Sequence, residues 1–159
     1  MNDGLSDVSA VVGDHSGRSR PVLEFTMEMK RIIDGAKRPG FDAGSWDPLA
    51  RLVDVDDFVR VGPFKDRMTW PEYVAFLTGW APRRYWECSL RGITEVGDRV
   101  YLELEERSSP LDSANAANSL SVYEFDEDGR LRRLDVYLQM QLPPGPTGAD
   151  EPQRGSQRA

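Results

Sequence analysis

The feature that most constrains the fold is a change of period: apolar residues follow helical spacing in the first half of the chain and alternate in the second. Alternating stretches lie at 85–94, 100–108, 117–125 and 130–141. Strict alternation is typical of strands with one buried face. Turns rich in Gly and Asp at 96–99 and 126–129 join the stretches in pairs. The second half is therefore predicted to form two antiparallel hairpins.

The first half is predicted to be mainly helical. After Pro21, which suits a first helical turn, the apolar residues share one helical face: Val22, Phe25, Met29, Ile32 and Ile33. A second, short helix is expected near Trp46 with Ser45 as its cap, and a short strand at 56–61. The run Thr69-Trp70-Pro71-Glu72 has the spacing of a capping box and predicts the start of a third helix.

About three helices on one side of an antiparallel sheet give the α+β class. The folded domain is expected over 21–141. Residues 1–20 and 142–159 are rich in small, polar and charged residues and lack periodic apolar positions. We expect them to be a disordered leader and a disordered tail.

Composition excludes several classes of function. The chain of 159 residues has a net charge of −7, which argues against a nucleic-acid partner and against an anionic membrane surface. No stretch reaches the roughly 18–20 apolar residues of a membrane span, and the N-terminus has no apolar signal core, so the cytoplasm is expected. The single cysteine, Cys88, and the single histidine, His15, exclude an internal disulfide, a catalytic triad and a zinc cluster. No metal and no cofactor are expected.

Alternation also predicts which side chains face the helices. Leu102 and Leu104 must face inward, and the same parity carries Glu106 onto that face. From the last stretch Leu134, Val136 and Leu138 face inward. The stretch 117–125 leaves two faces open, with Ser119, Ser121 and Tyr123 on one and Leu120, Val122 and Glu124 on the other.

Glu106 is the candidate for acid–base chemistry, because a carboxyl group beside apolar neighbours is suited to proton transfer. The alternative is that it lies at the frayed end of its strand, in solvent or paired with Arg107, Arg83 or Arg84. Cys88 is interpreted as a small buried hydrophobic residue. The four tryptophans either line a cavity or pack in the core: Trp46, Trp70, Trp80 and Trp86.

The opposite face of the sheet is predicted to be solvated. Glu103, Glu105 and Asp135 lie on it by parity. They are also placed to pair across strands, or across a dimer interface, with Arg91 or Arg133.

Two motifs resemble the nuclear transport factor 2-like superfamily, which includes SnoaL-like domains, ketosteroid isomerases and limonene epoxide hydrolases. They are the run DDFVRVGPF at 56–64 and the run FDEDGRL at 125–131, followed by DVYL at 135–138. The similarity spans roughly 22–140. It implies a cone-shaped, curved sheet wrapped around the helices to enclose a pocket. It also implies a homodimer formed through the outer face of the sheet.

The resemblance breaks down at the catalytic positions. Ketosteroid isomerases of this fold carry a general base directly before the Pro-Phe pair, where this chain has Gly62. Their acidic oxyanion donor matches Ser121, and their first-helix tyrosine falls near Met29. Limonene epoxide hydrolases use an inward aspartate on the last strand; the matching residue is Val136, with Asp135 on the opposite face. We therefore do not expect steroid isomerisation or epoxide hydrolysis by the routes known for these enzymes.

The resemblance thus implies a pocket protein for a small, mostly apolar molecule. Any catalysis is expected to be cofactor-free acid–base work, such as isomerisation, cyclisation, dehydration or hydrolysis, with Glu106 moving the proton. The alternative is a non-catalytic ligand-binding or dimeric scaffold module. The residues expected to contact the ligand are Tyr73, Trp86, Leu102, Leu104, Ser119, Ser121, Tyr123, Leu134, Val136 and Leu138. Ser121, Tyr123 or Tyr73 would donate hydrogen bonds to a substrate oxygen.

Overall fold

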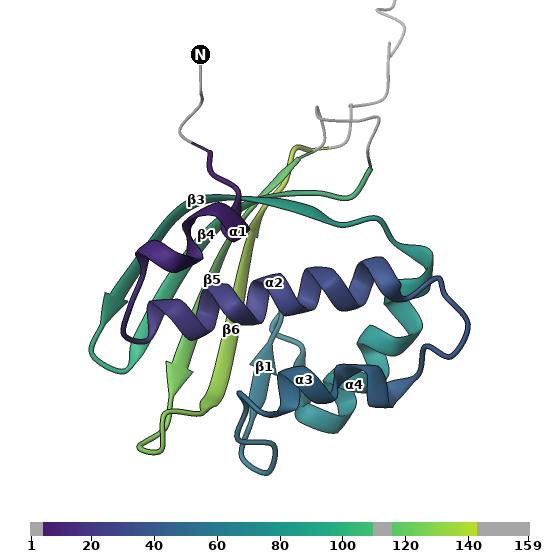
Figure 1. Cartoon of the computed structure of the whole chain (residues 1–159), viewed down its shortest axis with the longest axis horizontal. Coiled ribbons are helices and arrows are strands. Elements are labelled where there is room, and N and C mark those ends of the chain that lie inside the picture. The colour runs from purple at the N-terminus through teal and green to yellow at the C-terminus, as the bar shows by residue number, and fades with distance from the viewer. Residues whose placement is uncertain (1–4, 110–115, 143–159) are drawn as a thin grey trace, which may run out of the picture.

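The computed structural model describes residues 5–109 and 116–142. Its helices and strands form an α+β fold in which the sheet bends around helix α2 (Figure 1). The helices are α1 (Val8–Val11), α2 (Ser19–Gly35), α3 (Asp47–Ala50) and α4 (Trp70–Trp80). The strands are β1 (Val59–Val61), β2 (Arg67–Thr69), β3 (Glu87–Val96), β4 (Arg99–Arg107), β5 (Ala117–Phe125) and β6 (Leu131–Gln139). Of the predicted tail, only residue 142 lies within the described residues.

The sheet has the order β2-β1-β6-β5-β4-β3. The four long strands pair antiparallel as two hairpins, as predicted. The expectation of a wholly antiparallel sheet is wrong at one edge, because β1 runs parallel to β6, with Arg60 beside Leu134. Strand β2 was not predicted. Strands of three residues carry too little alternation to reveal a direction or a face.

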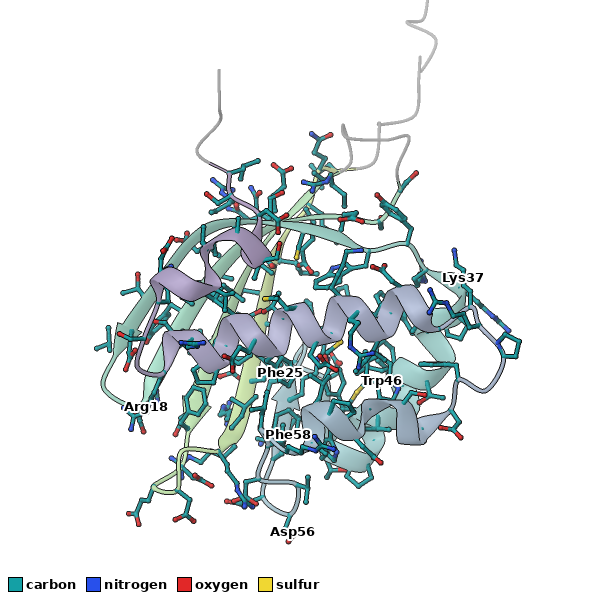
Figure 2. All side chains as sticks on the ribbon, in the orientation of Figure 1. Arg18, Phe25, Lys37, Trp46, Asp56 and Phe58 are labelled. Atoms are coloured by element: carbon teal, nitrogen blue, oxygen red, sulfur yellow. The ribbon has the colours of Figure 1, made fainter. Side chains whose placement is uncertain are left out.

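Helix α2 buries the apolar face that the sequence predicts. Among the residues it packs into the core are Phe25 and Ile32, and the Phe25 ring lies edge-on to Tyr123 of β5, with the centroids 6.0 Å apart. Figure 2 shows Phe25, Trp46 and Phe58 in the interior between α2 and the elements below it. The helix begins at Ser19, two residues before Pro21. Its first amides, those of Arg18 and Ser19, donate to the Glu95 carboxylate of β3 at 3.0 and 3.2 Å.

Helix α4 begins with the predicted capping box. The amide of Thr69 donates to the Glu72 carboxylate at 2.7 Å, and the Glu72 amide donates to the Thr69 hydroxyl at 3.5 Å. A 3-10 helix, Ala43–Trp46, leads into α3, and its cap is Asp42 instead of Ser45: the Asp42 carboxylate accepts the Gly44 amide at 2.9 Å. Ser45 is its capping-box partner, because its hydroxyl accepts the Asp42 amide at 3.2 Å.

Two bulges set which side chains face inward. In β3 the register shifts between Leu90 and Gly92, so that Leu90 pairs with Leu104 while Ile93 pairs with Leu102. Gly92 then lies beside Glu103 on the outer face, where a Cβ would stand 2.7 Å from a Glu103 oxygen. A second register shift lies between β5 and β6, where Glu124 pairs with Arg133 while Phe125 pairs with Leu131. It lets both Leu131 and Leu134 face the core. Bulges of this kind bend strands and increase their twist, which curves the sheet around α2.

The expectation of a disordered leader is wrong for residues 5–20. The backbone of Ser6 pairs with Leu90 at the free edge of β3 through two hydrogen bonds of 3.0 and 2.7 Å. Helix α1 follows, capped by Asp7, and Val8 is buried in the core at 4% exposure. The segment is held by the apolar contacts of Val8, Val11 and Val12, by this edge pairing, and by hydrogen bonds from Arg18 to Glu95 and Gly97. None of these contacts produces a periodic signal in the sequence.

We predict that Val8→Ala lowers the free energy of unfolding by about 1.5–2 kcal/mol, since two buried methyl groups are lost at about 0.8 kcal/mol each. Ala10→Ser, at an exposed position of the same helix, is the matched control and is expected to change stability by less than about 0.5 kcal/mol. Urea denaturation measures both. Equal stability of Val8→Ala and wild type would show that the leader does not belong to the folded unit.

Candidate functional site

A cavity of about 490 Å³, hereafter the central cavity, lies between α2, α4 and the concave face of the sheet. Its walls are mainly apolar, with contributions from Phe25, Ile33 and Leu77. Nine of the ten residues expected to contact a ligand line it: Tyr73, Trp86, Leu104, Ser119, Ser121, Tyr123, Leu134, Val136 and Leu138. The tenth, Leu102, does not line it and is fully buried in the core. Whether these residues bind a ligand stays a prediction.

Glu106 faces the central cavity, as parity predicts. The indole Nε1 of Trp86 donates a hydrogen bond to its Oε1 at 2.7 Å. Arg107 was weighed as an ion-pair partner of Glu106, but it pairs with Glu105 at 2.8 Å instead. Within residues 5–109 and 116–142 the Glu106 side chain has no ion pair. Glu106 is thus a half-buried carboxylate on the cavity wall that is held by one neutral donor.

The open question about β5 is answered by the structure. Ser119, Ser121 and Tyr123 face inward, where Ser119 and Tyr123 are 5% and 6% exposed. Ser121 lies between Leu102 of β4 and Val136 of β6. Burial raises the pKa of the Tyr123 hydroxyl, so it stays protonated and able to donate. The concave face thus carries a row of hydroxyl groups beside apolar side chains.

Arg60 is a cavity residue that the sequence analysis did not identify. It lies in β1 between two valines, and alternation within three residues does not decide its face. Parallel pairing with the inward Leu134 places Arg60 on the inner side. Its guanidinium lies over the ring of Tyr73, 5.1 Å from the centroid. Burial raises the pKa of Tyr73, and the Arg60 charge opposes that shift.

The neighbourhood of Gly62 explains why that position has no side chain. A Cβ there would stand 2.3 Å from a carboxylate oxygen of Asp66. That carboxylate accepts from Arg60 at 3.3 Å. The Asp66 carboxylate therefore occupies the space that a side chain at position 62 would need.

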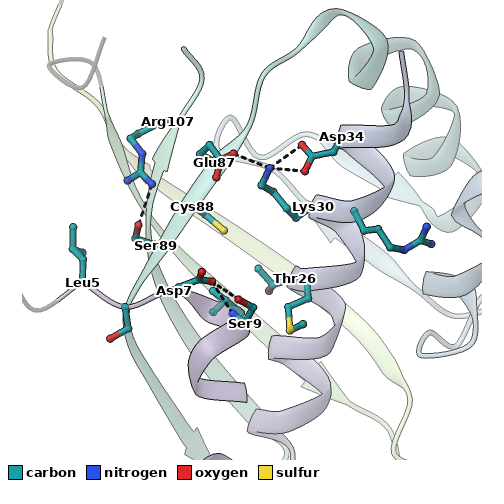
Figure 3. Close-up of a pocket in the computed structure, with 14 residues that line it drawn as sticks. Leu5, Asp7, Ser9, Thr26, Lys30, Asp34, Glu87, Cys88, Ser89 and Arg107 are labelled. Atoms are coloured by element: carbon teal, nitrogen blue, oxygen red, sulfur yellow. Dashed lines mark hydrogen bonds and ion pairs between the residues drawn. The ribbon is translucent and has the colours of Figure 1, made fainter. Parts of the chain in front are cut away.

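A second hollow, the side groove, has about 540 Å³ and lies between the leader, α2 and β3 (Figure 3). Its polar groups are partnered with one another: Lys30 lies 2.7 Å from Asp34 and 2.8 Å from Glu87. Burial acts to lower the pKa of Lys30, but the hydrogen bonds to both carboxylates outweigh it and the net shift is upward. Because its charges are already satisfied, the side groove is a weaker candidate than the central cavity.

Cys88 also borders the side groove and pairs with Glu106 across β3 and β4. Burial raises the pKa of its thiol to about 12, and the nearby Glu106 and Glu87 charges add to the shift. The thiol is therefore protonated at neutral pH, which agrees with its interpretation as a packing residue and not a nucleophile.

We predict that Cys88 reacts with Ellman's reagent roughly 1000-fold more slowly than an ordinary thiol at pH 8, because only the thiolate attacks and burial suppresses it. Absorbance at about 412 nm follows the reaction. The same protein unfolded in guanidinium chloride, where the thiol titrates normally, is the control. A fast reaction in the native protein would contradict the buried, protonated state.

Other site types find no support in the part of the chain that the structure describes. Those residues include no group of three or more His, Cys, Asp or Glu side chains placed to hold a metal ion. No helix among them is long and apolar enough to cross a membrane.

Comparison with known proteins identifies the fold. The sequence matches no protein-family model and no curated protein. A nuclear transport factor 2-like protein of unknown function from Cytophaga hutchinsonii is 15% identical, with a TM-score of 0.51 over 79% of this chain and 92% of its own. A steroid delta-isomerase from Pseudomonas aeruginosa is 17% identical, with a TM-score of 0.55 over 78% of this chain and 81% of its own. A nuclear transport factor 2-like protein of unknown function from the same organism is 16% identical, with a TM-score of 0.55 over 76% of this chain and 96% of its own.

At these identities the similarity shows the fold. The chain has the nuclear transport factor 2-like fold, and the resemblance drawn from residues 56–64 and 125–138 is confirmed at that level.

Proposed function

We propose that the central cavity binds a small, mostly apolar molecule and that Glu106 exchanges a proton with it without a cofactor. The observation that carries the proposal is the half-buried Glu106 carboxylate on the cavity wall, oriented by Trp86 at 2.7 Å and without an ion pair to any described cation. The hydroxyl groups of Ser121 and Tyr73 line the same cavity. They supply the fixed dipoles that stabilise charge on a substrate oxygen.

The alternative, a non-catalytic scaffold, would require aromatic side chains to fill the hollow. Trp46 is buried in the core instead, with its Nε1 donating to Thr78 at 3.1 Å. Phe76 is 44% exposed at the wall of the cavity, and Trp86 is held by Glu106. A cavity of about 490 Å³ beside these rings falls in the range of small-molecule sites. This supports a ligand-binding role over a purely structural one.

Steroid isomerisation by the route of the fold's known isomerases is not proposed. The base position is Gly62, and the Asp66 carboxylate that occupies its space is tied to Arg60. The proton-transferring group proposed here lies on β4, a different part of the cavity wall.

Proton transfer can be tested without knowing the natural substrate. We expect the wild type to bind 2-tetralone, a small apolar ketone with acidic C–H bonds, and to catalyse exchange of those hydrogens in D₂O. Glu106→Gln keeps the shape of the side chain but cannot accept a proton. It is expected to lower the exchange rate about 100-fold or more while leaving the affinity within about three-fold. Calorimetry measures binding and mass spectrometry measures exchange.

Glu103→Gln is the matched control, because this exposed side chain leaves the same strand on the opposite face and does not line the cavity. It should leave the exchange rate unchanged. Equal exchange by the wild type and Glu106→Gln, with 2-tetralone bound, would identify a ligand carrier and remove Glu106 from catalysis. If 2-tetralone and a panel of terpenoids and aromatic lactones all fail to bind, the cavity is not a site for small apolar molecules.

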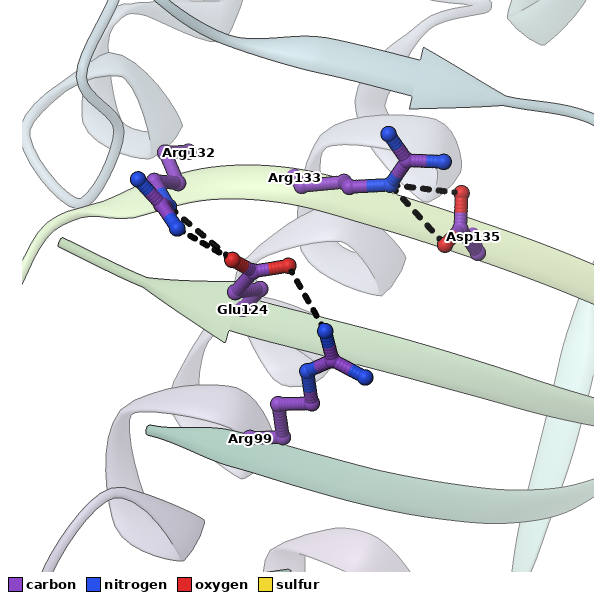
Figure 4. Close-up of polar contacts among 5 residues, drawn as sticks. All are labelled: Arg99, Glu124, Arg132, Arg133 and Asp135. Carbon is purple, nitrogen blue, oxygen red and sulfur yellow. Dashed lines mark hydrogen bonds and ion pairs between the residues drawn. The ribbon is translucent and has the colours of Figure 1, made fainter. Parts of the chain in front are cut away.

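We also propose that two copies pair through the outer face of the sheet. Figure 4 shows ion pairs of this face that form within one chain: Glu124 lies between Arg132 and Arg99, and Arg133 contacts Asp135 at 3.0 Å. The centre of the face carries half-buried and exposed apolar groups on neighbouring strands, namely Tyr101, Leu120, Val122 and Tyr137. A face that carries internal ion pairs and an apolar centre suits a second copy related by a two-fold axis.

Light scattering on a sizing column is expected to give twice the 17.9 kDa of one chain. Val122→Lys places like charges near the two-fold axis and should shift the mass toward one chain. Val96→Lys, at the exposed β3–β4 turn, should leave it unchanged. A wild-type mass of one chain at about 50 μM would rule out this dimer.

A further inference from the structure

The charged residues of the central cavity have the opposite balance to the chain as a whole. The chain has 27 acidic and 20 basic residues. The cavity lining contains three arginines, Arg60, Arg84 and Arg107, and one carboxylate, Glu106. Arg107 is engaged by Glu105 at 2.8 Å and by the Ser89 hydroxyl at 3.0 Å. Arg84 is exposed. Arg60 is the cation held inside the wall.

The hydrogen-bonding capacity of Arg60 is largely unused. Its side chain is 13% exposed; one oxygen of the half-exposed Asp66 lies 3.3 Å from Nη1, and the Tyr73 hydroxyl is a second hydrogen-bond partner. The Nε atom is buried and has no partner among the described residues. A guanidinium has five N–H donors, and a buried donor without an acceptor is costly. Packing of the guanidinium over the Tyr73 ring, 5.1 Å from the centroid, holds its plane in place.

This arrangement restricts the chemistry of the ligand. A carboxylate presents two acceptors in a plane and matches the two-pronged donor edge of arginine. The rest of the cavity near Arg60 is apolar, with Leu134 and Val136 of β6 next to it in the sheet. Glu106 lies farther away, on β4, with β5 and β6 between its strand and that of Arg60. A second anionic group reaching Glu106 would be repelled.

We propose that the central cavity takes a small amphipathic monocarboxylic acid, with the carboxylate bound to Arg60 and the apolar body extending toward Glu106. The inference rests on the proposed function and adds the substrate class: an acid with a ring or branched apolar body, in place of a neutral hydrocarbon or ketone. Arg84, exposed among the residues that line the same cavity, attracts such an anion toward it.

Two nearly isosteric probes isolate the charge: 1-naphthaleneacetate and 1-naphthaleneacetamide, titrated calorimetrically at pH 7 and low salt. The wild type is expected to bind the acid at least about ten-fold more tightly than the amide. Arg60→Gln should reduce that preference to within about two-fold, mainly by weakening the acid. Arg60→Lys keeps the positive charge but cannot donate two parallel hydrogen bonds to a carboxylate, so it should retain part of the preference for the acid over the amide. Arg84→Gln should weaken the acid by about two- to three-fold.

Arg67→Gln, an exposed arginine on the neighbouring strand β2 and outside the cavity, is the matched control and should bind like the wild type. Thermal unfolding of each variant identifies any loss of fold, and Arg60→Lys retains the test if Arg60→Gln does not fold. Equal wild-type affinity for acid and amide, or an acid preference that survives Arg60→Gln, overturns the inference. If 2-tetralone binds in that case, the proposed function stands; if none of the three probes binds, both fail.

Discussion

The structure depends on burial of the apolar face of α2 against the concave side of the sheet. The helix supplies one continuous apolar stripe, and β4, β5 and β6 supply the facing rows, with Phe25 meeting Tyr123 edge-on. Contact is tight along the first part of the helix, where Val22 and Leu23 are almost fully buried. Toward its other end, Met29 and Ile33 border the central cavity. The sheet is bent by its bulges and remains open, so a single helix cannot fill the concave side along its whole length.

Because α2 leaves part of the concave side unfilled, the few polar groups on the inner face of the sheet border a cavity. Glu106 and Arg60 both line the central cavity, but they lie on different strands and have different partners. Trp86 orients Glu106 with a neutral donor, and Tyr73 supports Arg60 through its ring. Between them are the hydroxyl groups of β5. The cavity therefore has a carboxylate and a buried guanidinium at separate places on its wall, with hydroxyl and apolar groups between them, and this asymmetry suits a ligand that is itself amphipathic.

The departure from known enzymes of this fold also has a structural reason. Gly62 leaves no side chain at the usual position of the base, and the space is taken by Asp66, whose carboxylate contacts Arg60. The Gly62 turn and Arg60 are thus linked through the Asp66 carboxylate. One fold hosts different chemistries through different site residues, so the fold alone does not decide the reaction.

The sequence by itself determined the elements that have a period or a cap: α2, the capping box of α4, both hairpins and, through strand parity, the inward position of Glu106. The tertiary structure alone decided the rest. The leader is held by core contacts such as that of Val8 and by the pairing of Ser6 with Leu90, the α2 start is capped by the distant Glu95, and Arg60 faces inward because β1 runs parallel to β6. Local patterns record which residues alternate along one segment. These three features arise from contacts between segments far apart in the chain, which leave no local pattern to read.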